Sequence, residues 1–416
     1  MAAEGPRPRL STWLLRPYLD LGPFQMGPLH AGALEECWRA FIDPTTVPFI
    51  PQRAMPPGFR TQLAEEAGGP PYTLSDPREL PEGLRTSRWR ELCDALDGWS
   101  GLAGDRKCRL ASLLHSMCLY QPLLALIPEV GAGVRGTGGD SLELAFWRAS
   151  ARFMQDLPHR IADYDDADMS VFEAIALHAP DAVPAGFNAT AMVFVHKAKT
   201  GAPVHELAEW ERRFENALGR AIPGVDTFTA GLFTSRFYRG RAFLPQRQGD
   251  PKEVVRVMDR AERHALELAP ATSAQELLYR ENLHALMESR TKEALWLDDK
   301  DQALARSLRV VEVDPYDAKA WAELGEIRYL RKEWQEAAHA YALAAMLGPP
   351  ASALGRHLAG VCLRELGHDL LAALFFKDAA ELDPLGISPR EEIRELPDVA
   401  VLKALKEWSR DTVAWW

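Results

Sequence analysis

The sequence has few cysteines, and their spacing argues against the chemistry that cysteine clusters usually provide. The five cysteines are odd in number, widely separated and never arranged as C-x-x-C (Cys37, Cys93, Cys108, Cys118 and Cys362). A disulfide framework or a cysteine-based zinc site needs paired or closely spaced cysteines. The pattern therefore favours reduced thiols and a cytoplasmic location.

Long apolar runs and net positive charge are missing as well. The most apolar stretch, LASLLHSMCLYQPLLALIPEV, is interrupted by His115, Gln121 and Pro122, and the N-terminal WLL is too short for a signal-peptide core. The formal net charge is −11 at pH 7, which opposes a general attraction to nucleic-acid phosphates or anionic lipids. We therefore expect no membrane partner and no nucleic-acid partner.

Proline is abundant, but it is concentrated at the N-terminus. The first 81 residues hold 14 of the 30 prolines, and proline blocks long helices because it lacks the backbone donor. We predict an irregular, Pro-rich wrapping arm over residues 1–86, with at most a short helix around HAGALEECWRAFI. The aromatic residues in this arm indicate that it packs against the rest of the chain.

From Ser87 onward the pattern is helical. In SRWRELCDALDGW, apolar residues recur at the three- and four-residue spacing of one helix face. We predict a helical domain over residues 87–225, built either from divergent repeats or as a separate domain. The segment TAMVFVHK is the one short strand candidate, so the predicted fold class is all-α.

Two segments near the C-terminus share glycine, alanine and aromatic residues at matching positions. The unit ending at Pro349 has small and aromatic residues at set places (Trp321, Leu324, Gly325, Ala337, Tyr341, Ala344). The unit ending at Pro384 repeats them (Gly360, Ala372, Phe376, Ala379). Glycine and alanine allow two helices to approach closely, and the aromatic residues fill the seam between them.

This pattern resembles the tetratricopeptide repeat (TPR), most clearly over residues 284–384. The resemblance implies helix pairs stacked into a superhelix, with TPR-like repeats over 226–384 and a C-terminal capping helix over 385–416. One departure is that Pro270 lies 45 residues before Pro315, so the preceding unit is longer than the family pattern.

The resemblance also implies a concave groove, lined by the first helix of each pair, for an extended peptide or a helix. The expected partner-binding residues on this face are Lys292, Trp296, Lys319, Glu326, Tyr329, His357 and Arg364. The version of the family that clamps a C-terminal carboxylate has Lys and Asn where this chain has Ala322 and Glu326, so that ligand is not predicted. The alternative for these residues is packing against the chain's own N-terminal arm.

The predicted function is accordingly a non-catalytic adaptor or accessory protein that binds a protein or peptide, with no cofactor. The alternative is an enzyme or metal-binding protein with its site in the 87–250 region, where Asp163, Asp165, Asp166 and Asp168 form an oxygen-rich run. Single histidines such as His115, His178 and His284 have no second ligand at metal spacing and are interpreted as core or surface residues.

Three further motifs lie in the same region. GAGVRG, residues 131–136, has the glycine spacing of a dinucleotide loop but lacks a preceding strand, so we predict that it binds no nucleotide. GGDSL contains Ser141 as a formal hydrolase nucleophile, although a helix cap explains it more simply. FTSRFYRGRAFLPQR interleaves aromatics with Arg236, Arg239, Arg241 and Arg247. We expect the aromatics to face the core and the arginines to face solvent or acidic neighbours, and an acidic protein or peptide is favoured over nucleic acid as a partner.

Overall fold

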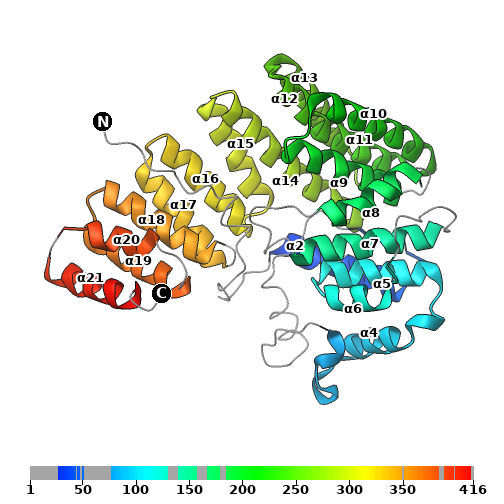
Figure 1. The fold of residues 1–416 in the computed structure, drawn as a ribbon, viewed down its shortest axis with the longest axis horizontal. Helices are drawn as coiled ribbons and strands as arrows, with labels where there is room; N and C mark the ends of the chain where they lie inside the picture. Colours follow the sequence, from blue (N-terminus) through cyan, green and yellow to red (C-terminus); the bar gives the residue numbers. More distant parts are fainter. Residues whose placement is uncertain are drawn as a thin grey trace.

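The computed structural model describes residues 27–43, 45–46, 49–50, 76–129, 139–156, 166–178, 184–348, 351–383, 388–397 and 399–413. Within these ranges every regular element is a helix, which confirms the predicted all-α fold class. From α4 onward the helices follow one another in chain order along an arc, while α2 lies beside α7 in the middle of it (Figure 1). The strand candidate TAMVFVHK was wrong, because it lies inside a helix that is buried on most sides.

The N-terminal part of the arc has one large hydrophobic core, to which residues from Ala33 to Leu244 contribute. Short 3-10 turns occur at Pro77–Glu79, Glu82–Leu84, Trp99–Gly101 and Ile222–Gly224. The helices are α2 (Pro28–Ile42), α4 (Ser87–Asp97), α5 (Gly104–Ser116), α6 (Tyr120–Leu126), α7 (Gly139–Asp156), α8 (Asp166–His178), α9 (Ala185–Lys199), α10 (Val204–Ala221), α11 (Thr227–Arg241) and α12 (Phe243–Gln248).

Helix α4 shows how the sequence sets such an element. Thr86 caps its start by accepting the N–H of Trp89 at 3.2 Å, which satisfies one of the free amides of the first turn. Trp89, Leu92 and Leu96 then fall on one face and are all buried. The helical spacing seen in the sequence therefore corresponds to the side of α4 that enters the core.

Helix α2 confirms the short helix predicted within the Pro-rich arm. It begins at Pro28, which suits the first turn because proline needs no hydrogen-bond acceptor there. Trp38 and Phe41 are buried in the large core, and α2 packs against both α5 and α14. This helix therefore joins the N-terminal core to the C-terminal half of the chain.

The C-terminal half is a series of helix pairs with smaller cores. Its helices are α13 (Pro251–Leu266), α14 (Ser273–Trp296), α15 (Lys300–Val313), α16 (Ala318–Leu330), α17 (Trp334–Leu347), α18 (Ser352–Glu365) and α19 (Asp369–Leu382). Each helix from α14 to α19 packs against the next one in the chain. Ala337 and Ala372 have no exposed surface, as expected for positions where two helices approach closely.

Two helices follow, where the sequence suggested one capping helix. They are α20 (Ser388–Glu395) and α21 (Ala400–Val413). Ile393 and Leu402 are buried against Phe376, so they cover the apolar side of the last repeat pair. Among the described helices, none combines the length and the apolar character that crossing a bilayer requires.

Candidate functional site

Four basic side chains from four different helices lie near one another, and we call them the cationic face. They are Lys199 of α9, Arg239 of α11, Lys292 of α14 and Lys319 of α16. Burial is the main reason why the pKa of Lys199 is lowered, and the charges of Lys292, Lys319 and Arg239 lower it further, which places these three cations within electrostatic range of Lys199. The fold therefore brings together cations that are far apart in the sequence.

Acidic residues neutralise part of this face. Lys319 Nζ lies 2.5 Å from Glu288 Oε1 and 3.4 Å from Glu323 Oε1. These partners raise the pKa of Lys319 despite its burial, and Lys319 in turn lowers the pKa of Glu288. Lys292 Nζ is 3.8 Å from Glu323 Oε1 and remains 61% exposed, so it keeps most of its charge available to solvent.

The other two cations have no such close partner, although the carboxylate of Glu288 lies within electrostatic range of both. Among the described residues, neither Lys199 nor Arg239 forms a hydrogen bond or an ion pair. Burial lowers the pKa of both groups, although the Lys199 side chain is exposed and that of Arg239 is half-buried. Both side chains therefore keep contact with solvent, where an anion could approach them.

An exposed aromatic residue lies beside this face. Trp296 is four residues after Lys292 on α14 and is 38% exposed. Residues four apart on a helix are neighbours on its surface. Large aromatic side chains that keep exposed area are typical anchors of protein interfaces, so Trp296 extends the cationic face with an apolar contact.

The remaining predicted partner-binding residues lie elsewhere. Tyr329 is partly buried, with its ring 4.9 Å from that of Trp334, and Glu326 is also partly buried. His357 is 3% exposed and packs edge-on against Phe376. Arg364 forms an ion pair with Glu392 of α20. The predicted set is therefore divided between the cationic face and the surface beneath the C-terminal cap.

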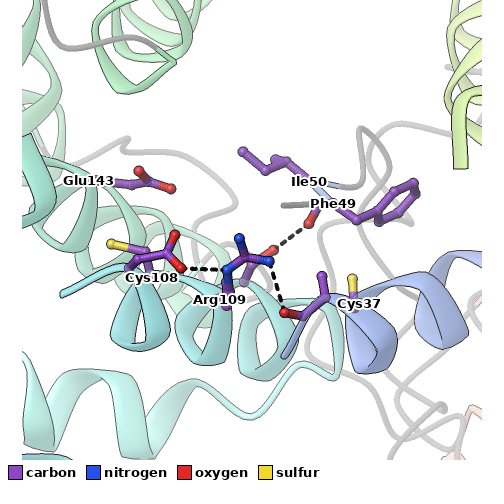
Figure 2. A pocket seen from close by; sticks show the side chains of 9 residues that line it. Cys37, Phe49, Ile50, Cys108, Arg109 and Glu143 are labelled. Atoms are coloured by element: carbon purple, nitrogen blue, oxygen red, sulfur yellow. Dashed lines mark hydrogen bonds and ion pairs between the residues drawn. The ribbon is translucent and has the colours of Figure 1, made fainter. Parts of the chain in front are cut away.

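A small pocket of about 40 Å³ between α2, α5 and α7 is the other candidate site (Figure 2). Arg109 lines this pocket, but its guanidinium group already has partners. It donates to Asp105 Oδ2 at 2.7 Å and to the carbonyls of Ala40 and Thr46 at 3.0 and 2.8 Å. Burial raises the pKa of Cys37 to about 12, so this thiol is not a nucleophile at neutral pH. The pocket is best explained by packing.

Several sequence motifs lie partly or wholly outside the described residues. Residues 131–136 of the glycine loop lie outside them, and so do Asp163 and Asp165. Asp166 and Asp168 fall in the first turn of α8. Ser141 is exposed in the first turn of α7. Sequence reasoning did not identify Lys199, and it found Arg239 only as part of a basic run. The HKAK ending of α9 was the one available signal for Lys199.

No protein-family model and no curated protein matches this chain. Among solved structures it is similar to MamA from Desulfovibrio magneticus RS-1 (18% identity over 44% of this chain and 92% of that one, TM-score 0.33). It is also similar to YrrB, described as a TPR protein with an unusual peptide-binding site (18% identity over 53% of this chain and 95% of that one, TM-score 0.33). The APC/C hetero-tetramer Cut9-Hcn1 gives 14% identity, 78% and 68% coverage, and a TM-score of 0.28.

At these identities and TM-scores the likeness carries no argument about function. The chain's own geometry defines the class: it is an all-α protein with TPR-like helical repeats. In two successive helix pairs, a glycine lies directly against an aromatic ring, namely Gly325 against Tyr341 and Gly360 against Phe376. This is the close approach that the repeat pattern predicts.

Proposed function

We propose that this protein is a non-catalytic adaptor that binds an acidic segment of a partner protein on the cationic face. The observation that carries the proposal is the position of Lys199 and Arg239, two cations without an ion pair among the described residues, next to Lys292 and Lys319. Gathering like charges costs free energy in the free protein, because each disfavours the charged form of the others. An anionic ligand would remove that cost.

The composition of the chain supports a protein ligand over a nucleic acid. The whole chain carries a net charge of −11, so a long polyanion would meet repulsion outside the cationic face. A short acidic peptide would contact only the local positive charge. Trp296 could cover an apolar residue of such a peptide.

The test uses a fluorescent poly-glutamate peptide, with poly-glutamine as the uncharged control, in anisotropy titrations at low ionic strength. The variant Lys199→Glu with Arg239→Glu should weaken binding at least tenfold. The matched variant Arg309→Glu with Lys403→Glu makes the same change in net charge at exposed positions on α15 and α21, and should bind as the wild type does. Equal weakening by both double variants would show that only net charge matters.

Two further outcomes would count against the proposal. Binding of poly-glutamine as tight as that of poly-glutamate would exclude charge recognition. A single-stranded DNA oligonucleotide that binds more tightly than the peptide would move the assignment to nucleic acid. Rising salt should weaken the specific complex, because exposed charges are screened over about 10 Å at 0.1 M.

A further inference from the structure

Two aspartates hold the turn between α15 and α16, and each does so with one carboxylate oxygen. Asp314 Oδ1 accepts the N–H of Tyr316 at 3.2 Å. Asp317 Oδ1 caps α16 by accepting the N–H groups of Lys319 and Ala320 at 2.9 and 3.3 Å. The Oδ2 atoms of both residues are therefore left to face other groups.

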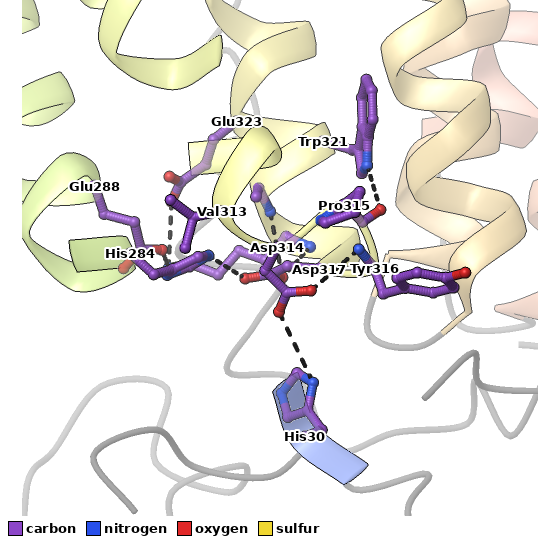
Figure 3. A network of polar contacts seen from close by, with 12 residues as sticks. His30, His284, Glu288, Val313, Asp314, Pro315, Tyr316, Asp317, Trp321 and Glu323 are labelled. Atoms are coloured by element: carbon purple, nitrogen blue, oxygen red, sulfur yellow. Dashed lines mark hydrogen bonds and ion pairs between the residues drawn. The ribbon is translucent and has the colours of Figure 1, made fainter. Parts of the chain in front are cut away.

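Each remaining oxygen faces a histidine (Figure 3). Asp317 Oδ2 lies 3.0 Å from Nε2 of His284 on α14, and Asp314 Oδ2 lies 3.9 Å from Nδ1 of His30 on α2. The candidate ligand atoms of His284, Asp314 and Asp317 all fall within 4.8 Å of one another. His30, His284 and Asp314 are at most 5% exposed, so the cluster is buried where three parts of the chain meet.

We propose that His30, His284, Asp314 and Asp317 form a structural site for one divalent transition-metal ion, best suited to Zn²⁺. Two imidazoles and two carboxylates match the ligand preferences of Zn²⁺, whose bonds to nitrogen and oxygen are about 2.0–2.2 Å. Tetrahedral geometry at that length places ligand atoms ~3.4 Å apart, so small side-chain rotations would bring His284, Asp314 and Asp317 to bonding positions. His30, whose Nδ1 lies 3.9 Å from Asp314 Oδ2, would move further to become the fourth ligand.

The electrostatics of the cluster favour a cation. Two carboxylates that face each other in a buried place repel, and a divalent ion would neutralise both. Lys319, a basic residue two positions after Asp317, pairs through its ammonium group with Glu288 and Glu323. Four protein ligands would leave no open position, which is typical of a structural ion and not of a catalytic one.

The expected effect of the ion is to fasten α2 to the repeats. The turn is already rigid, since Arg280 donates to the Val313 carbonyl and Trp321 donates to the Pro315 carbonyl, both at 2.8 Å. Gly27, just before α2, lies so close to Tyr316 that an added Cβ would come within 2.5 Å of the tyrosine Cβ. A metal ion here would therefore join pre-arranged partners and stabilise the folded chain.

The test measures metal binding by the full-length chain after removal of bound metal with a chelator. Titration with Zn²⁺ should give one ion per chain and raise the melting temperature. The double variant His30→Asn with His284→Asn should lose at least about 100-fold in Zn²⁺ affinity, since even indirect partners of metal ligands are worth 10–100-fold. His264→Asn is the control, because His264 has a single carboxylate beside it, Glu267 at 3.8 Å, and its ring stacks on Tyr238.

Co²⁺ provides a readout that does not depend on the variants folding. Wild-type protein should show the visible absorption of tetrahedral Co²⁺ with nitrogen and oxygen ligands, without the strong thiolate bands that cysteine ligation gives. Thiolate bands, the absence of stoichiometric Zn²⁺, or full retention of Zn²⁺ by the folded double variant would each overturn the proposal. If the double variant does not fold, the Co²⁺ spectrum of the wild type decides.

Discussion

Gly325 lies directly against the ring of Tyr341, so closely that a Cβ on the glycine would come within 2.7 Å of Tyr341 Cδ1. The same relationship recurs 35 residues further on, where a Cβ on Gly360 would come within 2.6 Å of Phe376 Cε1. Real Cβ atoms do not approach other atoms so closely. The two helices of each pair can therefore pack as they do only because the first one has no side chain at this position.

Gly325→Ala should destabilise the protein by about 1–3 kcal/mol, because the added methyl group displaces the buried Tyr341 ring. The matched control is Gly219→Ala in α10, where an added Cβ meets nothing within 4 Å. That change should stabilise by about 0.5–1 kcal/mol, since alanine is the better helix former. Urea unfolding of both variants measures the difference. Equal effects would contradict the packing described here.

Ala337→Leu tests the same seam from the second helix. Ala337 has no exposed surface, so three additional carbon atoms must push α16 and α17 apart, at a cost of about 1–3 kcal/mol. Gln335→Leu, at an exposed position of the same helix, is the control. A melting temperature for Ala337→Leu equal to that of the control would show that the repeat alignment is misplaced.

The repeat pairs were predictable because their pattern depends on local packing. Gly325, Ala337 and Tyr341 are each required by a neighbour within the same helix pair, so their spacing is visible in the sequence. Within helix α9 the segment TAMVFVHK was a strand candidate because a short buried apolar run looks the same in a helix and in a strand.

The two candidate sites could not be predicted in the same way, because tertiary folding brings their residues together. Lys199 and Lys292 lie on α9 and α14, and no sequence spacing relates them. His284 was judged to lack a second ligand, yet Asp317 lies 3.0 Å away across the α14–α16 contact. Only a prediction of how the helices pack would have revealed either cluster.

The buried His115 should make stability depend on pH. Burial lowers its pKa from 6.5 to about 4, although a hydrogen bond with Ser150 Oγ at 2.9 Å opposes the shift. The unfolded chain therefore binds a proton before the folded chain does, so stability falls as pH drops from 6.5 to 4, by at most about 3 kcal/mol.

The variant His115→Gln cannot titrate and should lose less stability over this pH range than the wild type. Urea unfolding at about pH 7 and about pH 4, the limits of the range over which His115 titrates, measures the change in the free energy of unfolding. Burial raises the pKa of Glu293 to about 7, which gives a slope of opposite sign, but this group is present in both proteins and cancels in the comparison. Parallel pH profiles would rule out His115 as the cause.

The glycine loop at residues 131–139 is still predicted to bind no nucleotide. The helix that follows it, α7, begins at Gly139 and is preceded in the described chain by α6, a helix and not the strand that a dinucleotide site requires. Thermal-shift measurements with dinucleotides and nucleoside triphosphates should show no stabilisation. A dose-dependent rise in melting temperature with any of them would reverse this interpretation.

The last prediction concerns Arg364, which the sequence assigned to partner binding and which the structure places against the C-terminal cap. Its guanidinium pairs with Glu392 and lies 3.8 Å from Glu395, both on α20. Burial opposes ionisation of Glu392, but a hydrogen bond with His357 and the charge of Arg364 together lower its pKa, so both partners contribute to holding α20 on the last repeat above that pKa. Arg364 could therefore act through the cap, through a partner, or through both.

Comparing Arg364→Ala with Glu392→Gln separates these roles, because both changes break the same ion pair and only one removes the cation. If Arg364 only holds α20, both variants should lower the melting temperature to a similar extent and bind poly-glutamate as the wild type does. If Arg364 also binds the partner, Arg364→Ala should weaken binding, while Glu392→Gln should leave it unchanged or strengthen it, since the freed guanidinium then faces solvent.

Tyr329→Ala extends the test: its ring contacts Trp334, so a loss of stability without a loss of binding would assign Tyr329 to packing. Normal binding by all three variants would restrict the partner surface to the cationic face around Lys199 and Arg239.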